Sequence, residues 1–372
     1  MTEPRHNAPD LTLFVAVMAL LTLGVVMVYS ASQYMAADSD IGDSLYYLKK
    51  QCLWAAIGLG GMFVAARLDP AVWAKWAWPV YGVGAALLLL VAAGAGVSSL
   101  GAERTLALGP VHFQPSEAAK IGLVFVLARW YSRSPKENAS FGRGFLLPLL
   151  LCGAPVGLIM VQPDLGTAVT LTGTAFLMMA AAGARPRYLA AMVVLGVLLV
   201  AAAIALEPFR AARFTAFLDP WQDPQGYGFQ TVQSLIAIGS GGVTGVGLGG
   251  GSAKWYYLPE VHTDFIFALI GEELGLIGAA FTVTLFAAVL WRGLRIALGS
   301  EDLFLSLLAF GLTAEIGVQA FINFFVATGM MPVTGIALPF ISYGGSSLVF
   351  SLAAVGVVLA VSRRLPPEKR QR

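Results

Sequence analysis

The first long apolar stretch, Leu11–Tyr29, reads LTLFVAVMALLTLGVVMVY and contains no charged side chain. A helix of about 20 such residues spans the hydrocarbon core of a bilayer. The whole chain of 372 residues continues this pattern, with 58% hydrophobic and only 12% charged residues. Because a soluble domain carries about 25% charged residues, this composition excludes a soluble enzyme, a disordered chain and a nucleic-acid-binding domain. It predicts an all-α polytopic membrane protein.

Nine further stretches of similar character predict ten transmembrane helices in total. The weakest of them, Ser116–Tyr131, carries Glu117 and Lys120, but leaving it out would break the alternation of the later loops. With ten spans, 16 of the 23 Lys and Arg residues fall on the side of the N-terminus, which the positive-inside rule assigns to the cytoplasm. We therefore expect both termini to be cytoplasmic, with 363–372 as a basic tail. The other predicted spans are 51–66, 78–95, 145–161, 165–183, 189–206, 264–291, 303–327 and 338–361.

The connection between predicted helices 7 and 8 is a large extracytoplasmic loop, Glu207–Thr263. A loop this long is usually functional or disordered, and its aromatic content favours function. Within it, Phe229–Ile238 predicts a short amphipathic helix at the membrane interface. The glycines of 239–251 do not have phosphate-loop spacing and indicate flexibility or close packing. Presentation of their amides to a lipid pyrophosphate is the alternative.

Ionisable side chains inside apolar spans mark functional sites by default. Glu117 and Lys120 share a helix face, either as an internal ion pair or as the lining of a wet cavity. Asp264 opens a predicted helix, where a carboxylate either caps the first-turn amides or does chemistry. Glu272 and Glu273 point to different sides of that helix, so we expect one of them to bond only a neighbouring helix.

Two weaker features accompany these charges. Ala268, Gly271 and Gly275 lie below Asp264 and either pack tightly against another helix or leave a groove for an acyl chain. Glu315 lies midway along a later span, where a helix–helix hydrogen bond is expected. The three histidines lie far apart in the sequence, and no paired Cys/His spacing indicates a zinc site.

Four motifs together resemble those of the SEDS family of shape, elongation, division and sporulation proteins, over nearly the whole chain. They read FQPSEAAK at Phe113–Lys120, QPDLGT at Gln162–Thr167, YLPEVHTDFIFALIGEELGLIG at Tyr257–Gly278, and NFFVATGMMPVTGIALPFISYGGSS at Asn323–Ser347. The wording resembles the division members (FtsW) more than the elongation members (RodA). In one departure, Arg104-Thr105 stands where relatives often have Arg-Trp, which puts an aromatic contact in doubt.

The resemblance implies a single SEDS-type domain over 1–372 that acts as a peptidoglycan glycosyltransferase and polymerises lipid II, an undecaprenyl-pyrophosphate disaccharide-pentapeptide. Asp264 matches the essential aspartate and is expected to be the general base on the acceptor 4-hydroxyl. The pyrophosphate leaving group needs cations, for which Arg210, Arg213, Lys120 and Lys254 are candidates. A divalent cation such as Mg²⁺ or Mn²⁺, held by Asp264 and a second carboxylate, could replace or help them.

Further site residues and partners follow from the same resemblance. Glu117 and Lys120 are expected to line the cavity, and His262 and Ser342 to contribute to substrate binding. The implied partners are a class B penicillin-binding protein (an FtsI-like transpeptidase) and divisome regulators of the FtsQ, FtsL and FtsB type, in the bacterial inner membrane at the division septum; no nucleic acid is expected. The alternatives are a lipid II flippase, a non-catalytic scaffold and an elongation polymerase.

Overall fold

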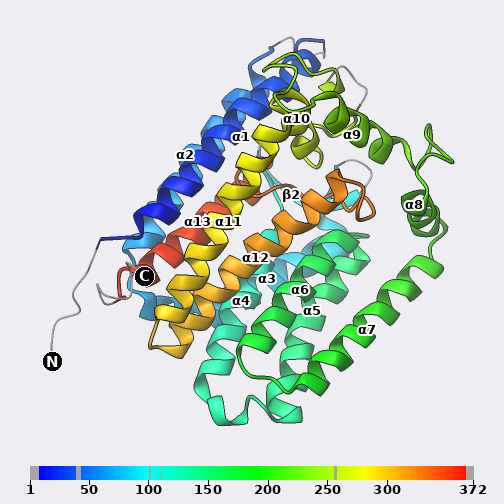
Figure 1. Cartoon of the computed structure of the whole chain (residues 1–372). Helices are drawn as coiled ribbons and strands as arrows, with labels where there is room; N and C mark the ends of the chain where they lie inside the picture. Colours follow the sequence, from blue (N-terminus) through cyan, green and yellow to red (C-terminus); the bar gives the residue numbers. More distant parts are fainter. Residues whose placement is uncertain (1–7, 39–42, 100–101, 110, 255–257, 366–372) are drawn as a thin grey trace.

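The computed structural model describes residues 8–38, 43–99, 102–109, 111–254 and 258–365. Predicted features that include Arg5, Tyr257 or residues 366–372 of the basic tail lie partly outside this range. The described part is a bundle of helices with the N- and C-terminal ends at the same end (Figure 1). Its α-helices are α1 Leu11–Asp38, α2 Tyr46–Arg67, α3 Pro70–Leu90, α4 Pro115–Arg133, α5 Leu147–Val161, α6 Leu165–Ala181, α7 Pro186–Ala205, α8 Pro208–Leu218, α9 Phe229–Ser240, α10 Ile266–Glu273, α11 Gly275–Gly299, α12 Leu303–Ala327 and α13 Gly345–Ser362.

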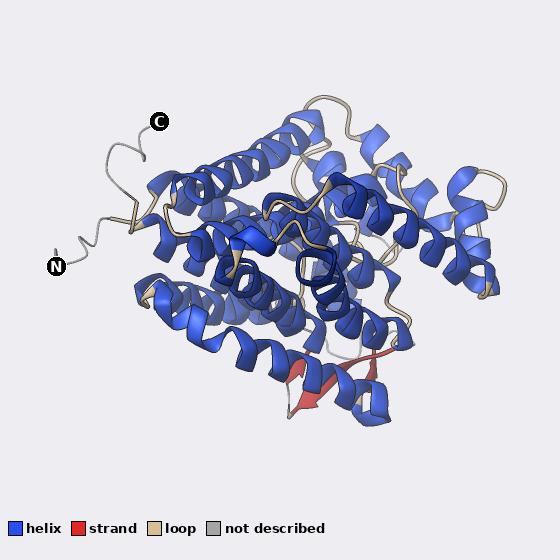
Figure 2. Cartoon of the chain, turned by 90° about the horizontal axis from the view of Figure 1, so that it is seen from below, coloured by secondary structure: helices blue, strands red, loops and turns tan. Residues whose placement is uncertain are grey.

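A small antiparallel sheet lies between α3 and α4, and the described fold is otherwise helical, as expected. The strands β1 Val97–Ser99, β2 Ala102–Leu108 and β3 Val111–Phe113 pair in the order β1-β2-β3, and Figure 2 shows them grouped in one place. The β2–β3 pair brings Leu106 opposite Phe113, and Gly109 between the strands has a φ of 65°. This left-handed conformation suits glycine in a tight turn. The helical periodicity used to find spans gives no signal for so short a hairpin.

Among the described residues, seven helices are long and apolar enough to cross a membrane, which makes the chain a multi-pass membrane protein. They are Leu11–Gln33, Pro70–Ala95, Gly142–Val161, Pro186–Ala205, Gly275–Gly299, Leu303–Ala327 and Gly345–Ser362. The three remaining predicted spans correspond to α2, α4 and α6, which run through the same bundle (Figure 1). Ten spans with cytoplasmic termini therefore remain a prediction.

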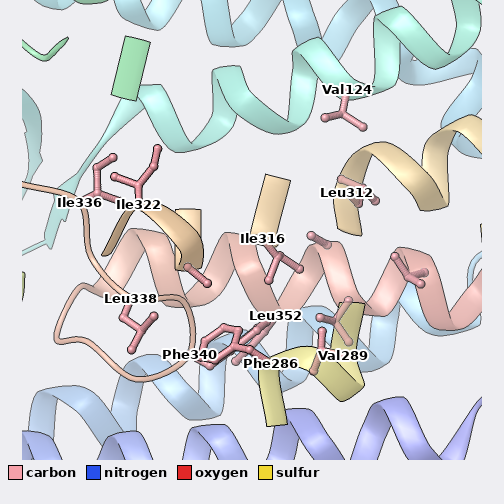
Figure 3. Close-up of a cluster of buried hydrophobic side chains, with 14 of the residues drawn as sticks. Val124, Phe286, Val289, Leu312, Ile316, Ile322, Ile336, Leu338, Phe340 and Leu352 are labelled. Atoms are coloured by element: carbon pink, nitrogen blue, oxygen red, sulfur yellow. The ribbon is translucent and has the colours of Figure 1, made fainter. Parts of the chain in front are cut away.

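The weak hydropathy of α4 is explained by its position in the centre of the bundle. Most of its side chains are buried, including Glu117, Lys120 and Tyr131. It packs against α3, α6 and α12, and Figure 3 shows Val124 of α4 facing Leu312 of α12. By contrast, α7 is strongly apolar but buries only Tyr188 and Met192. A helix surrounded by protein can carry charges, whereas one that faces lipid must be apolar.

The predicted span 264–291 is two helices, α10 and α11, separated by a break at Gly275, whose φ is 66°. The glycine-rich segment 241–251 occupies the break. Val246 and Gly247 donate their amides to the carbonyls of Glu272 and Glu273, at 3.0 Å each. In return, the Leu276 and Ile277 amides bond the carbonyls of Gly242 and Val243. These backbone bonds replace helical ones, so the glycines serve close packing, and the Val246 and Gly247 amides are engaged within the protein.

The surroundings of Gly275 and its neighbours also show what the stripe of small residues below Asp264 contacts. A Cβ on Gly275 would lie 2.3 Å from the amide nitrogen of Gly245, and one on Gly271 would lie 3.1 Å from Ile238 of α9. Ala268 is fully buried. Of the two alternatives considered for this stripe, the structure therefore shows close packing against protein.

The long loop contains two helices of its own, α8 and α9. The expected short helix is confirmed as α9, and its buried face contacts α10 and α12. Ser234 of α9 donates a hydrogen bond of 2.6 Å to the carbonyl of Ala327 at the end of α12. This part of the amphipathic face is covered by protein.

Candidate functional site

Asp264 lies in a turn before α10 rather than within a helix. The carbonyl of Glu260 accepts the amides of Thr263 and Asp264 at 3.1 Å, and Glu260 itself adopts a left-handed φ of 55°. The N-terminal capping position of α10 belongs to Phe265, and no side chain caps that end. The first-turn cap considered for Asp264 is therefore not its role, and its carboxylate is available for other contacts.

Two side chains fix the backbone around Asp264. The amide of Asn323 in α12 donates to the carbonyls of Asp264, at 2.8 Å, and of Ile336, at 2.7 Å. The Ser342 hydroxyl donates to the Thr263 carbonyl. The Asp264 carboxylate faces Gly335, where an added Cβ would lie 3.5 Å from its Oδ2. The loop between α12 and α13 and the turn before α10 thus form one unit, in which Ser342 positions the backbone.

The environment of Asp264 raises its pKa to about 7. Burial is the main cause, and the negative charges of Glu260 and Asp164 raise the pKa further, while Arg104 and a hydrogen bond from Thr263 lower it. As a whole residue, Asp264 is only partly buried. A base with a pKa near the working pH is well matched to general acid–base catalysis.

Arg104 and Asp164 are neighbours of Asp264 that sequence reasoning did not assign to the site. Arg104 in β2 donates from Nε to the Gln162 carbonyl at 3.1 Å and from Nη2 to the Pro163 carbonyl at 2.8 Å. Asp164 caps α6 by accepting the Thr167 amide at 3.0 Å. The QPDLGT motif was the available signal for Asp164. The sequence gives no indication that β2 lies beside the QPDLGT motif.

Glu117 and Lys120 form a buried triad with Glu315. Lys120 lies 3.0 Å from a carboxylate oxygen of Glu117 and 3.0 Å from one of Glu315. The three side chains are at most 7% exposed. Of the two alternatives considered for Glu117 and Lys120, the structure shows the internal ion pair, which Glu315 of α12 joins. Lys120 is likewise not placed to meet a pyrophosphate.

Lys254 is also engaged inside the protein. Its side chain has 0% exposure and lies 3.0 Å from Glu273, whose carboxylate also accepts the Ser30 hydroxyl of α1. The neighbouring Glu272 accepts the Ser252 amide at 2.6 Å. Both glutamates therefore fasten the glycine-rich segment, and the predicted role of Lys254 in pyrophosphate binding is corrected to a structural ion pair.

Arg210 and Arg213 both lie on α8 but differ in their surroundings. Arg210 donates from Nη1 to the Ala203 carbonyl at 3.3 Å. The Arg213 guanidinium lies over the Phe209 ring, 4.4 Å from its centre. Burial lowers the pKa of Arg213, the Arg104 charge lowers it further, and Tyr227 and Asp264 oppose this. Arg213 is thus within electrostatic reach of Asp264.

His262 packs against two tyrosines. Its ring centre lies 5.2 Å from that of Tyr47 and 5.7 Å from that of Tyr343. Burial lowers the pKa of His262, although Glu260 opposes this, so the ring is neutral at neutral pH. The structure places His262 in an aromatic contact that joins α2 to the loop before α13.

The described residues form no site that could hold a catalytic metal ion through His, Cys, Asp and Glu side chains alone. No group of three or more His, Cys, Asp or Glu side chains lies close enough to hold one. Asp264, Asp164 and Glu260 influence one another through charge without forming such a group.

Comparisons with known proteins agree with this architecture. Residues 11–366 match the family described as cell cycle protein, FtsW/RodA/SpoVE. The chain is 43% identical to the stage V sporulation protein E of Bacillus subtilis (strain 168), over 96% of this chain and 98% of that protein. It is equally identical to the probable peptidoglycan glycosyltransferase FtsW of Geobacter sp. (strain M18), over 97% and 98%.

Two solved structures share the fold. A chain of a peptidoglycan synthase complex, described as coordinating polymerization and crosslinking, superposes with a TM-score of 0.80 at 35% identity, covering 96% of this chain and 98% of that one. The rod shape determining protein RodA of Thermus thermophilus gives a TM-score of 0.71 at 31% identity, covering 96% and 97%. With the family match over nearly its whole length and relatives above 40% identity, this chain belongs to the FtsW/RodA/SpoVE family.

Proposed function

We propose that this chain is a peptidoglycan glycosyltransferase that polymerises lipid II for septal wall synthesis during cell division. The observation that carries the proposal is Asp264, a partly buried residue with a pKa of about 7 and a backbone held by Asn323 and Ser342. The relatives named glycosyltransferases support it. The chain acts as one membrane domain of ten spans in the inner membrane, with 207–263 outside and both termini in the cytoplasm.

In the proposed reaction, Asp264 accepts the proton of the acceptor sugar's 4-hydroxyl. The hydroxyl oxygen forms a bond to the anomeric carbon of the donor, and the bond from that carbon to the lipid pyrophosphate breaks. The pyrophosphate leaves with the electron pair of the broken bond as an anion. One direct displacement inverts the anomeric configuration.

The leaving group needs positive charge rather than an acid. Of the cations expected from the sequence, Arg210 and Arg213 on α8 remain candidates because Lys120 and Lys254 are held in buried ion pairs. Arg213 is favoured because the negative charge of Asp264 acts on its pKa. Guanidiniums suit this task because their donors fit phosphate oxygens.

We derive no step through a resident metal ion, since the described residues offer no cluster to hold one. Mg²⁺ is commonly held by one or two carboxylates together with substrate phosphates. Titration of Mg²⁺ and Mn²⁺ into chelator-treated enzyme with lipid II tests whether an ion enters with the substrate.

The proposed partners are a class B penicillin-binding protein, which cross-links the new strand, and divisome regulators of the FtsQ, FtsL and FtsB type. The structural likeness to a chain of a peptidoglycan synthase complex supports the first of these.

The test is incubation of the purified chain, with and without the class B penicillin-binding protein, with labelled lipid II. Wild type is expected to give a ladder of glycan strands, and Asp264→Asn none. Glu137→Gln is the matched control, because the Glu137 side chain is 58% exposed and is paired with Arg143. Lipid II scrambling in liposomes without a ladder from the wild-type complex would contradict the proposal and favour a flippase.

A further inference from the structure

The buried triad of Glu117, Lys120 and Glu315 contains two carboxylates and a single ammonium group. Lys120 Nζ lies 3.0 Å from one oxygen of each carboxylate, and the three side chains are at most 7% exposed. Charges that are removed from water need a partner of opposite sign, and the interior of a membrane protein makes this requirement stricter. With both carboxylates ionised, the triad is therefore one positive charge short of neutrality.

Helices α4 and α12 pass the triad in opposite directions, and two printed contacts fix their register. Lys120 of α4 pairs with Glu315 of α12. A Cβ added to Gly311 of α12 would lie 2.7 Å from Cγ1 of Val124 in α4, and Figure 3 shows Val124 facing the adjacent Leu312. Four residues forward along α4 thus correspond to four residues backward along α12, which is about one helical turn in each.

The same register places Ser116 of α4 opposite Gln319 of α12, one turn beyond the triad. Ser116 is four residues before Lys120 and Gln319 is four residues after Glu315, so each shares a helix face with its neighbour in the triad. Both residues are 3% exposed. Their Oγ and Oε1 atoms are buried and have no hydrogen-bond partner among the described residues. Buried polar atoms of this kind are unfavourable unless a ligand satisfies them.

A ligand at this position has to supply positive charge and satisfy several oxygens at once. A proton on one carboxylate would remove the surplus charge but would add only one donor. A water molecule would add donors but no charge. A hard cation does both, because such ions bind carboxylate, amide and hydroxyl oxygens. A single surplus negative charge matches a monovalent cation, and the described residues offer no group of three or more His, Cys, Asp or Glu side chains for a more highly charged ion.

We propose that Na⁺ binds between α4 and α12 beside the triad, coordinated by Gln319 Oε1, Ser116 Oγ and a carboxylate oxygen of Glu315. The site is separate from the Asp264 carboxylate, and the inference does not depend on the proposed function. Asn323 lies one further turn along α12 and holds the backbone of Asp264. The ion therefore stabilises the pair of helices that supports the turn before α10.

The first test measures binding of radioactive Na⁺ to the detergent-purified full chain, without lipid II and with N-methylglucamine chloride keeping the ionic strength constant. Wild type is expected to bind Na⁺ saturably. Gln319→Leu and Glu315→Gln are each expected to weaken Na⁺ binding about tenfold or more, because each removes a ligand. Ser116→Ala should weaken it in the same direction. The Ser116 hydroxyl has no partner among the described residues, so this variant keeps the test decisive if the other two unfold.

Thr313→Val is the matched control on the same helix. The Thr313 side chain is buried, and its hydroxyl donates within α12 to the Ala309 carbonyl at 2.7 Å. This variant is expected to bind Na⁺ as wild type does. The absence of saturable Na⁺ binding by wild type would overturn the inference, as would unchanged affinity in both Gln319→Leu and Ser116→Ala.

Thermal midpoints measured in Na⁺ and in N-methylglucamine at several pH values distinguish a cation from a proton. Saturating Na⁺ is expected to raise the wild-type midpoint by about 2 °C or more and to raise that of Gln319→Leu by less. A wild-type midpoint that depends on pH but not on Na⁺ would overturn the inference, because a proton would then neutralise the triad. An equal rise in wild type and Gln319→Leu would also overturn it by placing the effect of Na⁺ elsewhere.

Discussion

The Asn323 side chain donates a hydrogen bond of 2.8 Å to the backbone carbonyl of Asp264. Asn323 is 1% exposed, and its second hydrogen bond goes to Ile336 in the following loop. One buried amide thereby ties α12 to both segments that surround the Asp264 carboxylate. Asp264 is positioned by the tertiary fold rather than by its own helix.

Replacement of this amide is expected to reduce turnover while leaving some activity. Asn323→Ala leaves two buried carbonyls without a donor, at about 1–3 kcal/mol for each unsatisfied group. We expect polymerisation by the variant to fall at least about tenfold, because a misplaced base loses its alignment, with a lowered thermal midpoint. The comparison is Asp264→Asn, which should lose polymerisation with little change in the midpoint. Wild-type turnover by Asn323→Ala would refute this positioning role.

The pH dependence of the reaction should report Asp264. Its carboxylate must be ionised to accept a proton, and its pKa is about 7. The rate is therefore expected to rise as the pH increases through about 7 and to level off above it. The measurement is single-turnover polymerisation with a saturating partner across this pH range.

Substitution of Glu260 is expected to shift the pH dependence of the reaction rate. Its negative charge raises the pKa of Asp264, so Glu260→Gln should lower that pKa and shift the midpoint to more acidic pH. Glutamine keeps an oxygen that can accept the Thr263 hydroxyl, as Glu260 does at 3.1 Å. A midpoint that stays at the wild-type pH would show that another group controls the reaction.

The buried triad should contribute to stability as a unit. Lys120→Met leaves Glu117 and Glu315 facing each other without a cation, and breaking a buried pair in this way costs about 3–5 kcal/mol. The triple variant Lys120→Met, Glu117→Gln, Glu315→Gln is expected to recover most of the loss, because no buried charge remains. Denaturant unfolding in detergent measures both.

An exposed pair provides the control for the triad. Lys49 and Asp43 lie 2.7 Å apart, with 65% and 40% of their side chains exposed. Exposed pairs are screened by water and contribute little, so Lys49→Met should unfold as wild type. A Lys120→Met variant that is equally stable would contradict the buried arrangement.

Substitutions at Gly82 and Gly84 of α3 allow the effect of close packing on stability to be measured apart from the effect of helix propensity. A Cβ on Gly84 would lie 2.9 Å from the Cα of Ala119 in α4, whereas one on Gly82 meets nothing within 4 Å. Gly84→Ala is expected to push α3 away from α4 and lower the thermal midpoint, since backbone cannot yield as a side chain can. Gly82→Ala should leave the midpoint equal or slightly higher, because alanine favours a helix by up to about 1 kcal/mol. Equal midpoints for the two variants would count against this close approach of α3 and α4.

The sequence by itself determined the membrane class and the approximate positions of the long helices, and it singled out Asp264 as a candidate site residue. Apolar length is a local property, so spans such as Leu11–Gln33 are readable without the fold. It also indicated that Glu117 and Lys120 belong together, because three residues apart on a helix means one face.

Only the tertiary structure decided what those charges meet. Glu315 joins Lys120 from a helix far along the chain, Lys254 pairs with Glu273, and Arg104 donates to the Gln162 carbonyl just before α6. The break at Gly275 likewise depends on a loop that supplies the missing backbone bonds. Local periodicity indicates which face of a segment is apolar. The partner of a buried charge is instead decided by packing between segments that are distant in the sequence, because a buried charge is stable only beside an opposite charge in the folded protein.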